Sequence, residues 1–357
     1  MLKKSNNTVS LPDWISFLIQ AARSAPSADN SQPWHFFWDG KTLDLCLDKL
    51  LSLGAEHPAI GLSMGCAIEN IIQAAHSVGI QDEALQLFPE NNIYLRVDAS
   101  SVADNLVVNK DLALFARHTN RNPFHSEKLS SDLVQKLGKQ TLKGVEIDFF
   151  ENKDDIAKIS TFINQASQAR FQNEQIHKWF ADSLRFTKQE VDKGDGLDLA
   201  TLALPPGGRL LLKLIAAWSR MKKLNSIGAY KLFASIEAAS FTKCGSIIAL
   251  YGNWDTPENS VSCGRVMQRT WVTLNENGYA VQPYFVLSDQ LYRLQKGLLP
   301  ENLLAEVKEL NQDASSFFNS KDKQLLMLLR VGKPLRKPEK SLRLQLSEIL
   351  SIHKQER

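Results

Sequence analysis

The stretch Arg-Ser-Ala-Pro-Ser-Ala-Asp-Asn-Ser-Gln-Pro-Trp-His-Phe, residues 23–36, lies between a helical pattern and a strand pattern. Pro26 disfavours helical geometry at the residue before it, so the preceding helix should end there. Pro33 in the same way predicts an extended backbone at Gln32. The residues between the two prolines should therefore form a short, stiff loop, and the rest of the chain can be arranged around it.

The polar side chains of this loop are Ser27, Asn30 and Gln32. An amide side chain offers a donor and an acceptor together, which suits a ligand edge that alternates C=O and N–H groups, as the pyrimidine side of a flavin ring does. A rigid helix-to-strand turn with local Asx hydrogen bonds would use the same residue types. The residues alone leave both interpretations open.

Composition narrows the class of protein. The chain has 357 residues with 43% hydrophobic content and a net charge of +3, from 42 basic and 39 acidic residues. That balance lacks the basic excess of a nucleic-acid surface, so a small-molecule function is favoured. The four cysteines form no Cys-x-x-Cys pair, which predicts neither a metal site nor a disulfide framework. They indicate thiols in a reducing compartment.

We expect a cytoplasmic protein that does not span a membrane. The basic N-terminus has no uninterrupted apolar core, and no apolar run reaches about 18 residues. Basic and apolar residues alternate over 209–231, a pattern that fits either an anionic membrane surface or the solvated face of a core helix.

The first part of the chain predicts an α+β arrangement. Ser10 is a candidate N-cap for a first helix with Pro12 in its first turn, and Asp39-Gly40 predicts a hairpin turn. A polar break over 100–105 suggests a boundary, which divides the chain into units 1–105 and 106–357. The predicted elements are a hairpin over 34–38 and 42–47, a helix over 58–79, and strands over 84–88 and 92–97.

The second part predicts more helices around an apolar strand. A breaker-rich connection at about 190–208 is typical of a functional or disordered loop, and the basic tail from 335 should end in an amphipathic helix over 342–352. Helices are expected over 112–116, 129–137, 154–190, 210–221, 229–239 and 261–277, and strands over 145–150, 246–251, 279–287 and 325–331.

One internal repeat is visible. Residues 63–80 and 262–279 both read Ser-x-Gly, then a helical pattern, then Gly, with Gly65 and Gly79 matching Gly264 and Gly278. Glycine-ended helices of this kind also recur by chance.

The run Ala-Pro-Ser-x-x-Asn-x-Gln-Pro-Trp resembles the signature of the nitroreductase family of FMN proteins, in which it follows the first long helix and lies against the flavin ring. It occupies residues 25–34 without a gap. The resemblance implies that the ring end of FMN would contact Pro26, Ser27, Ala28, Asn30 and Gln32.

A second element, Arg117-His118-Thr119-Asn120-Arg121, supplies two arginines and a hydroxyl within five residues, as a phosphate dianion requires. On its own it could be solvated surface. It resembles the Arg-x-Ser-x-Arg/Lys element of nitroreductases, which implies that Arg117 and Thr119 serve the phosphate and Arg121 lies near the ring. The closing strand of such folds commonly ends in basic residues that reach the same phosphate, which implies this role for Arg330 and Lys333. Either could equally be a solvated charge at the end of a strand.

The element at residues 25–34, which we call the ring loop, occurs once, in the first part of the chain. The element at residues 117–121, which we call the phosphate element, occurs once, in the second part. Nitroreductases are usually homodimers with flavin at the interface, so the resemblance implies an α+β nitroreductase-like fold of two related halves fused into a pseudo-dimer. One FMN per chain follows, and the chain could be a monomer. The layout is similar to the Acg-type branch, in which an insertion covers the flavin as a lid. The resemblance implies that the connection at about 190–208 is this lid.

This resemblance implies an oxidoreductase that passes hydride from NAD(P)H through FMN to nitro compounds, quinones or similar acceptors. The alternative is a non-enzymatic FMN-binding protein that stores flavin under the lid, and a third is a scaffold that has lost the cofactor. Because the flavin performs the hydride transfer, no catalytic acid or base is assigned.

Overall fold

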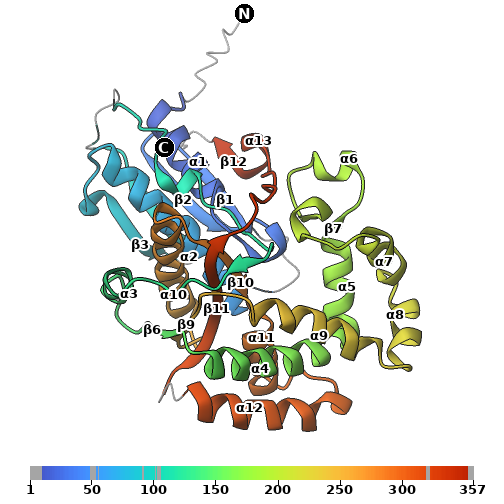
Figure 1. Cartoon of the computed structure of the whole chain (residues 1–357). Helices are drawn as coiled ribbons and strands as arrows, with labels where there is room; N and C mark the ends of the chain where they lie inside the picture. Colours follow the sequence, from blue (N-terminus) through green and yellow to red (C-terminus); the bar gives the residue numbers. More distant parts are fainter. Residues whose placement is uncertain are drawn as a thin grey trace, which may run out of the picture.

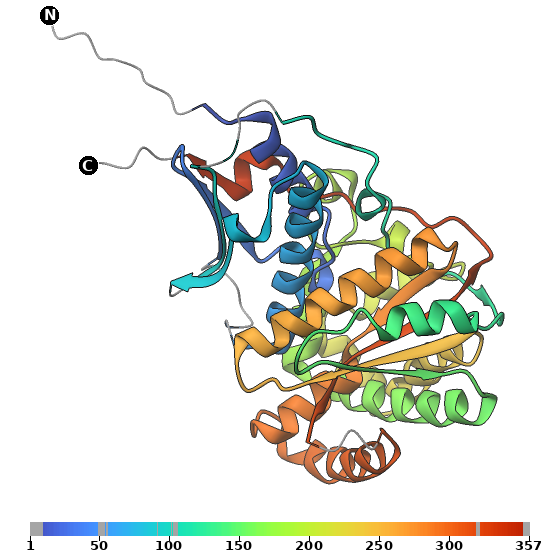
Figure 2. The same cartoon turned by 90° about the vertical axis from the view of Figure 1, so that its left-hand side faces the viewer.

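The computed structural model describes residues 10–48, 54, 56–90, 92–100, 102, 106–318 and 322–352. Two β-sheets flank a central pair of helices, α2 (Pro58–Ser77) and α10 (Pro257–Glu276). Figure 2 shows these helices between the sheets, with further helices on the outside. The mixed helix-and-sheet class predicted from the sequence is confirmed.

The first half contains α1, one sheet and α2. Its strands pair antiparallel in the order β1-β2-β4-β3, and Trp34, Phe36 and Trp38 of β1 bury one face of the sheet. The predicted hairpin and helix are present, but α1 starts after Pro12 rather than being capped by Ser10. The elements are α1 (Asp13–Arg23), η1 (Ala28–Asn30), β1 (Trp34–Trp38), β2 (Thr42–Leu47), η2 (Asp82–Ala84), β3 (Leu85–Glu90) and β4 (Ile93–Asp98).

The second half repeats this topology. Its strands pair antiparallel in the order β6-β9-β11-β10, which again places first, second, fourth and third strands side by side with one long helix between the second and third. This duplication matches the predicted pair of related halves. The elements are η3 (Ala113–Phe115), β5 (Phe124–His125), α3 (Ser131–Gly138), β6 (Glu146–Phe150), β9 (Ser246–Gly252), β10 (Ala280–Tyr284) and β11 (Gln324–Pro334).

The repeated helices α2 and α10 contact each other reciprocally. Each has 20 residues and starts at a proline, which suits the first helical position. A Cβ on Gly65 would lie 2.1 Å from the Val261 carbonyl oxygen, and a Cβ on Gly264 would lie 2.2 Å from that of Leu62. Equivalent residues thus meet equivalent surfaces, which is the geometry of a two-fold interface.

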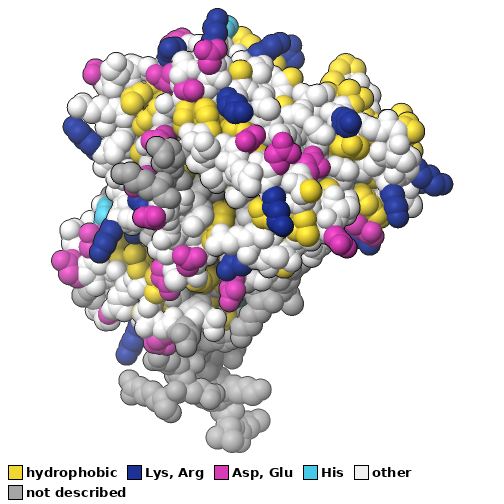
Figure 3. Space-filling view, turned by 90° about the horizontal axis from the view of Figure 1, so that it is seen from below, with side chains coloured by type: hydrophobic (Ala, Val, Ile, Leu, Met, Phe, Trp, Pro, Cys, Tyr) yellow, Lys and Arg dark blue, Asp and Glu magenta, His cyan; other side chains and the backbone are white. Residues whose placement is uncertain are grey.

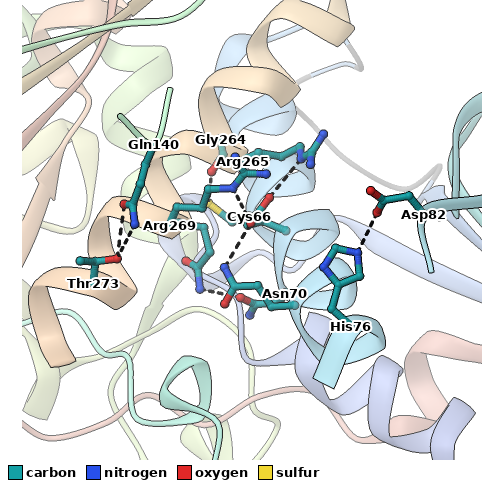
Figure 4. Close-up of polar contacts among 12 residues, drawn as sticks. Cys66, Asn70, His76, Asp82, Gln140, Gly264, Arg265, Arg269 and Thr273 are labelled. Carbon is teal, nitrogen blue, oxygen red and sulfur yellow. Dashed lines mark hydrogen bonds and ion pairs between the residues drawn. The ribbon is translucent and has the colours of Figure 1, made fainter. Parts of the chain in front are cut away.

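Polar contacts fasten the same two helices (Figure 4). Glu69, 2% exposed, pairs with the Arg265 guanidinium at 3.1 Å and the Arg269 guanidinium at 2.6 Å. The Gln268 amide donates to Asn70 Oδ1 at 2.7 Å, and Asn70 Nδ2 donates to the Ala21 carbonyl at 2.8 Å. The middle parts of α2 and α10 are therefore joined in one network, and Asn70 links it to the C-terminal end of α1 and to Ser24, where the loop begins.

Two insertions distinguish the second half from the first. The longer one separates β6 from β9, and the shorter one separates β10 from β11. Together they comprise α4 (Lys153–Gln172), α5 (Glu174–Ser183), β7 (Leu184–Arg185), α6 (Lys188–Val191), β8 (Leu197–Asp198), η4 (Leu199–Leu202), α7 (Gly208–Ile215), α8 (Trp218–Asn225), α9 (Ala229–Phe241), α11 (Val286–Gln295), η5 (Glu301–Leu303) and α12 (Leu304–Phe318).

Several predicted boundaries in the second half were wrong. The helix expected over 154–190 breaks at Asn173, whose side chain caps α5. The helix expected over 210–221 is divided into α7 and α8, and residues 112–116 form only a short 3₁₀ turn. The strand expected to reach residue 287 ends at Tyr284, because α11 starts at Val286. The predicted break at 100–105 lies mostly outside the described residues.

The C-terminal tail returns to the first half (Figure 1). Instead of the predicted helix over 342–352, it forms the short α13 (Leu346–Ile349) and β12 (Leu350–Ile352). β12 pairs parallel with β1, with Phe36 opposite Leu350. The free edge of β1 satisfies the backbone of the tail, a long-range contact that local periodicity cannot reveal. Among the described residues, none of the helices combines the length and apolarity needed to cross a membrane.

Candidate functional site

The loop that follows α1 has a strained backbone. Asp29, Asn30 and Gln32 have φ values of +46°, +58° and +50°, and they are three of the six non-glycine residues with positive φ in the described chain. The extended conformation predicted for Gln32 was therefore wrong. Such conformations cost about 1–2 kcal/mol each and concentrate at functional sites. The Ser27 hydroxyl holds the turn by accepting from the Gln32 N–H at 2.9 Å.

A cavity of about 200 Å³ lies where this loop meets the segment after η3. Both clusters predicted from the sequence reach it, one from each half. It also receives residues from the long insertion and from the C-terminal tail. Its lining is Ser24, Pro26, Ser27, Asp29, Asn30, Phe115, Arg117, His118, Thr119, Arg121, Leu197, Thr201, Glu339, Lys340, Ser341 and Arg343.

Arg117 is the most unusual residue of the cavity. It is 5% exposed, donates through Nη2 to the Ser24 carbonyl at 3.0 Å, and lies 4.6 Å from the centre of the Trp271 ring. Its Nε and Nη1 have no hydrogen-bond partner in the described part of the chain. Burial, together with Arg343, lowers its pKa to about 9. Buried donors without partners are costly, so an anion entering the cavity would stabilise this guanidinium.

The other charged groups make the cavity predominantly positive. Arg121 donates through Nη1 to the Thr201 carbonyl at 3.1 Å, and burial lowers its pKa while Asp29 opposes that shift. Burial raises the pKa of Asp29, and Arg121 again opposes the shift. The lining has more cations than carboxylates. The cations are Arg117, Arg121, Lys340 and Arg343, and the carboxylates are Asp29 and Glu339.

Arg343 contributes a further, partly buried cation that the sequence-based prediction missed. Its guanidinium donates to the carbonyls of Arg23 at 3.1 Å and Ala25 at 3.3 Å, and burial followed by Arg23 lowers its pKa to about 10. Arg23 in return donates to the Arg343 carbonyl at 3.2 Å. The basic composition of the tail was the available signal, but its position depends on β12 joining the first sheet.

The amides of Asn30 and Gln32 bind protein backbone. Asn30 Nδ2 donates to the carbonyls of Gly194 at 3.2 Å and Leu342 at 3.1 Å. Gln32 Nε2 donates to the Gly194 carbonyl at 2.9 Å, and its Oε1 accepts from the Leu344 N–H at 3.0 Å. These two side chains fasten the insertion and the tail to the loop. Asn30 also lines the cavity, whereas Gln32 lies behind it.

The other residues predicted for the site lie outside the cavity lining. The Ala28 N–H donates to Ser63 Oγ at 3.3 Å. Arg330 is 1% exposed, stacks 3.9 Å from the centre of the Phe124 ring and donates to the Asn122 carbonyl at 2.8 Å. Lys333 lies 3.8 Å above the Tyr279 ring and donates to the Asn277 carbonyl at 3.0 Å. Contact of these three residues with a ligand stays a prediction.

The segment predicted as a lid reaches the cavity through Leu197 and Thr201. At Gly194, which has φ +85°, a Cβ would lie 2.2 Å from the Arg343 carbonyl oxygen. The insertion and the tail are therefore packed backbone to backbone over the loop, and only glycine permits this approach.

Replacing Gln32 with alanine is expected to lower the free energy of unfolding by about 2 kcal/mol. The Leu344 N–H would lose its partner, and the Gly194 carbonyl would keep only the amide of Asn30. Urea denaturation would measure the change. Gln86, which is exposed on β3, gives the matched control: Gln86→Ala should stay within about 0.5 kcal/mol of the parent chain. Equal effects of the two substitutions would contradict the fastening role of Gln32.

Comparisons with known proteins find only distant similarity. No family model matches the sequence. An uncharacterised protein of Mycobacterium tuberculosis is 21% identical over 271 residues, which is 74% of this chain but only 38% of that relative. The chain therefore matches well under half of the relative's length.

Among solved structures, an FMN-dependent nitroreductase of Mycobacterium smegmatis in complex with NADPH is 14% identical, with a TM-score of 0.38, over 66% of this chain and 94% of that one. A nitroreductase of Desulfitobacterium hafniense with bound FMN is 11% identical, with a TM-score of 0.39, over 69% and 98%. Similarities at this level show neither the family nor the ligand of this chain. A function must therefore be argued from the chain's own motifs, strand order and cavity.

Proposed function

We propose that this chain is an FMN-binding protein of nitroreductase type, with one FMN held in the cavity between its halves. The observation that supports this best is the buried, partly unpartnered guanidinium of Arg117, placed where the two sequence elements converge. A phosphate dianion supplies the acceptors that Nε and Nη1 lack. Thr119, two residues further along the chain and also in the lining, would add a hydroxyl to this phosphate site.

The residues that line the cavity fit the phosphate end of FMN. The volume of the cavity, however, is small for the flavin ring. Small-molecule pockets usually measure about 300–1,000 Å³, whereas this cavity measures about 200 Å³. Glu339, Ser341 and Arg343 of the tail occupy part of its wall. Entry of the ring therefore requires this part of the tail to move outward while Asn30 keeps its place on the strained loop.

When bound, FMN would supply the hydride-transfer chemistry. The chain's own residues would orient it. Pro26, Ser27 and Asn30 would border the ring, and the positive charge of Arg121 would favour an anionic reduced flavin. We propose oxidoreductase activity, with NAD(P)H as the donor and nitro compounds, quinones or similar molecules as acceptors.

A second function, storage of FMN, is favoured by one specific feature. The insertion and the tail are both bonded to the ring loop through Gly194, Leu342 and Leu344, so access to the ring would be restricted. This arrangement suits the Acg-type layout, in which a lid covers the flavin. Restricted access would slow the exchange of nicotinamide and acceptor.

The remaining elements of the proposal concern assembly and location. The repeated strand order and the reciprocal α2–α10 contact support an intramolecular pseudo-dimer of units 1–105 and 106–357, with the tail crossing back to the first unit. A monomer with one FMN follows. Cys66, Cys244 and Cys263 are buried thiols, which is consistent with the proposed cytoplasmic location.

An absorption spectrum of the purified chain tests flavin binding. We expect flavin bands after reconstitution, with one FMN per chain. Protein that stays colourless after incubation with FMN would refute the proposal and favour a scaffold. Steady-state NAD(P)H oxidation with a quinone then separates the two functions, since rates no higher than those of free FMN would indicate storage.

A further inference from the structure

A second surface, unrelated to the cavity, lies on the long insertion. Residues 199–236 contain no aspartate or glutamate. All six of their lysines and arginines are exposed: Arg209, Lys213, Arg220, Lys222, Lys223 and Lys231. We call the part of the insertion formed by α7, α8 and α9 the basic lobe. In a chain with 42 basic and 39 acidic residues, this is a strong local separation of charge.

The basic lobe is also unusually apolar on its outside. Within the described residues, six of the thirteen exposed large hydrophobic side chains belong to it. Ile227 is 81% exposed and Leu210 is 75% exposed; the others are Leu211, Leu214, Leu232 and Ile236. In α7 only Gly208 and Ile215 are buried. The helix is thus not a core helix with a solvated face, which was one of the two interpretations of this segment.

The position of the lobe suits a contact with a large surface. Figure 1 shows α7 and α8 projecting from the side of the molecule, away from both sheets. In the space-filling view of Figure 3, hydrophobic side chains lie beside lysines and arginines on the projecting part of the molecule. Both kinds of group are therefore available to one extended partner.

We propose that the basic lobe docks onto an anionic membrane surface. Exposed leucine and isoleucine side chains would enter the boundary between headgroups and acyl chains, while the lysines and arginines bind lipid phosphates. A second copy of this chain is a poorer partner, because two surfaces with this excess of exposed lysine and arginine repel each other. The proposal does not depend on flavin binding.

Sedimentation of the full chain with vesicles tests the charge contribution. We expect binding to phosphatidylcholine mixed with phosphatidylglycerol and little binding to phosphatidylcholine alone. Lys222→Glu combined with Lys223→Glu should weaken binding at least about tenfold. The matched control is Lys136→Glu with Lys139→Glu, which changes net charge equally in the last turn of α3 and at the residue after it, and should alter binding by less than about twofold.

The apolar contribution has its own matched pair. Ile227→Ser removes an exposed β-branched side chain from the lobe and should weaken vesicle binding about fivefold. Val107→Ser removes one that is 86% exposed elsewhere, and it should have no effect. Equal behaviour of lobe and control variants, or binding that ignores lipid charge, would overturn the proposal. A parent chain that does not bind vesicles, but that self-associates or binds an acidic protein through the lobe, would also overturn it. The lobe variants would then abolish that association.

Discussion

Replacing Gly65 with alanine is expected to lower the free energy of unfolding by about 3 kcal/mol. The added Cβ would lie 2.1 Å from the Val261 carbonyl oxygen and 2.9 Å from the Gly264 Cα. Both are backbone atoms of α10, so no side chain can rotate away. The two helices would have to separate, and the Glu69 pairs with Arg265 and Arg269 would lengthen with them.

Urea denaturation of Gly65→Ala measures this cost, and two further variants make it specific. Gly264→Ala should cost a similar amount, since its Cβ would meet the Leu62 carbonyl in the reciprocal contact. The double variant should cost less than the sum, because one separation relieves both clashes. Gly138→Ala, also helical but with nothing within 4 Å, should be neutral or slightly stabilising. A Gly65 variant as stable as Gly138→Ala would refute the close-contact account.

The second large effect is expected at Arg117. Arg117→Met should weaken FMN binding at least about 100-fold, because it removes the charge-assisted donors proposed for the phosphate. The free protein should nevertheless lose no stability. Methionine fills similar space against Trp271 without leaving two buried N–H groups unpaired. A loss of FMN affinity without a loss of stability would distinguish a binding residue from one that only supports the fold.

Titration with FMN, followed by fluorescence quenching, and a parallel urea denaturation would measure both quantities. Lys333→Met is the control: it removes a cation that the structure places over Tyr279, outside the cavity lining, and should leave FMN affinity within about twofold. If Lys333→Met abolished binding and Arg117→Met did not, the phosphate would lie at the end of β11, and the cavity would not be the flavin site.

Closure of the site follows from the same contacts. Asn30 and Gln32 hold the tail and the insertion, while Arg343 seals the loop against Arg23 and Ala25. FMN exchange should therefore be slow compared with its binding to an open cleft. This would suit either a reductase that retains its flavin between turnovers or a protein that stores it.

Local sequence determined much of the first half. Pro26 follows the end of α1, Pro33 ends the loop before β1, Asp39-Gly40 sets the hairpin, and the glycines of 63–80 and 262–279 mark the repeated helices. These signals act within a few residues of their position, so the sequence alone is enough to read them. The same locality allowed the ring loop and the Arg117 element to be recognised as candidate ligand groups.

Only the tertiary structure decided which contacts the candidate ligand groups make and which of them line the cavity. Positive φ at Gln32 turns its amide toward Gly194 and Leu344, and parallel pairing of β12 with β1 brings Arg343 to the cavity. Burial against Phe124 keeps Arg330 out of the cavity lining, and the exposed leucines of α7 show that this helix is not a core helix. Each of these outcomes depends on hydrogen bonds or packing between residues far apart in the chain, which no local pattern encodes.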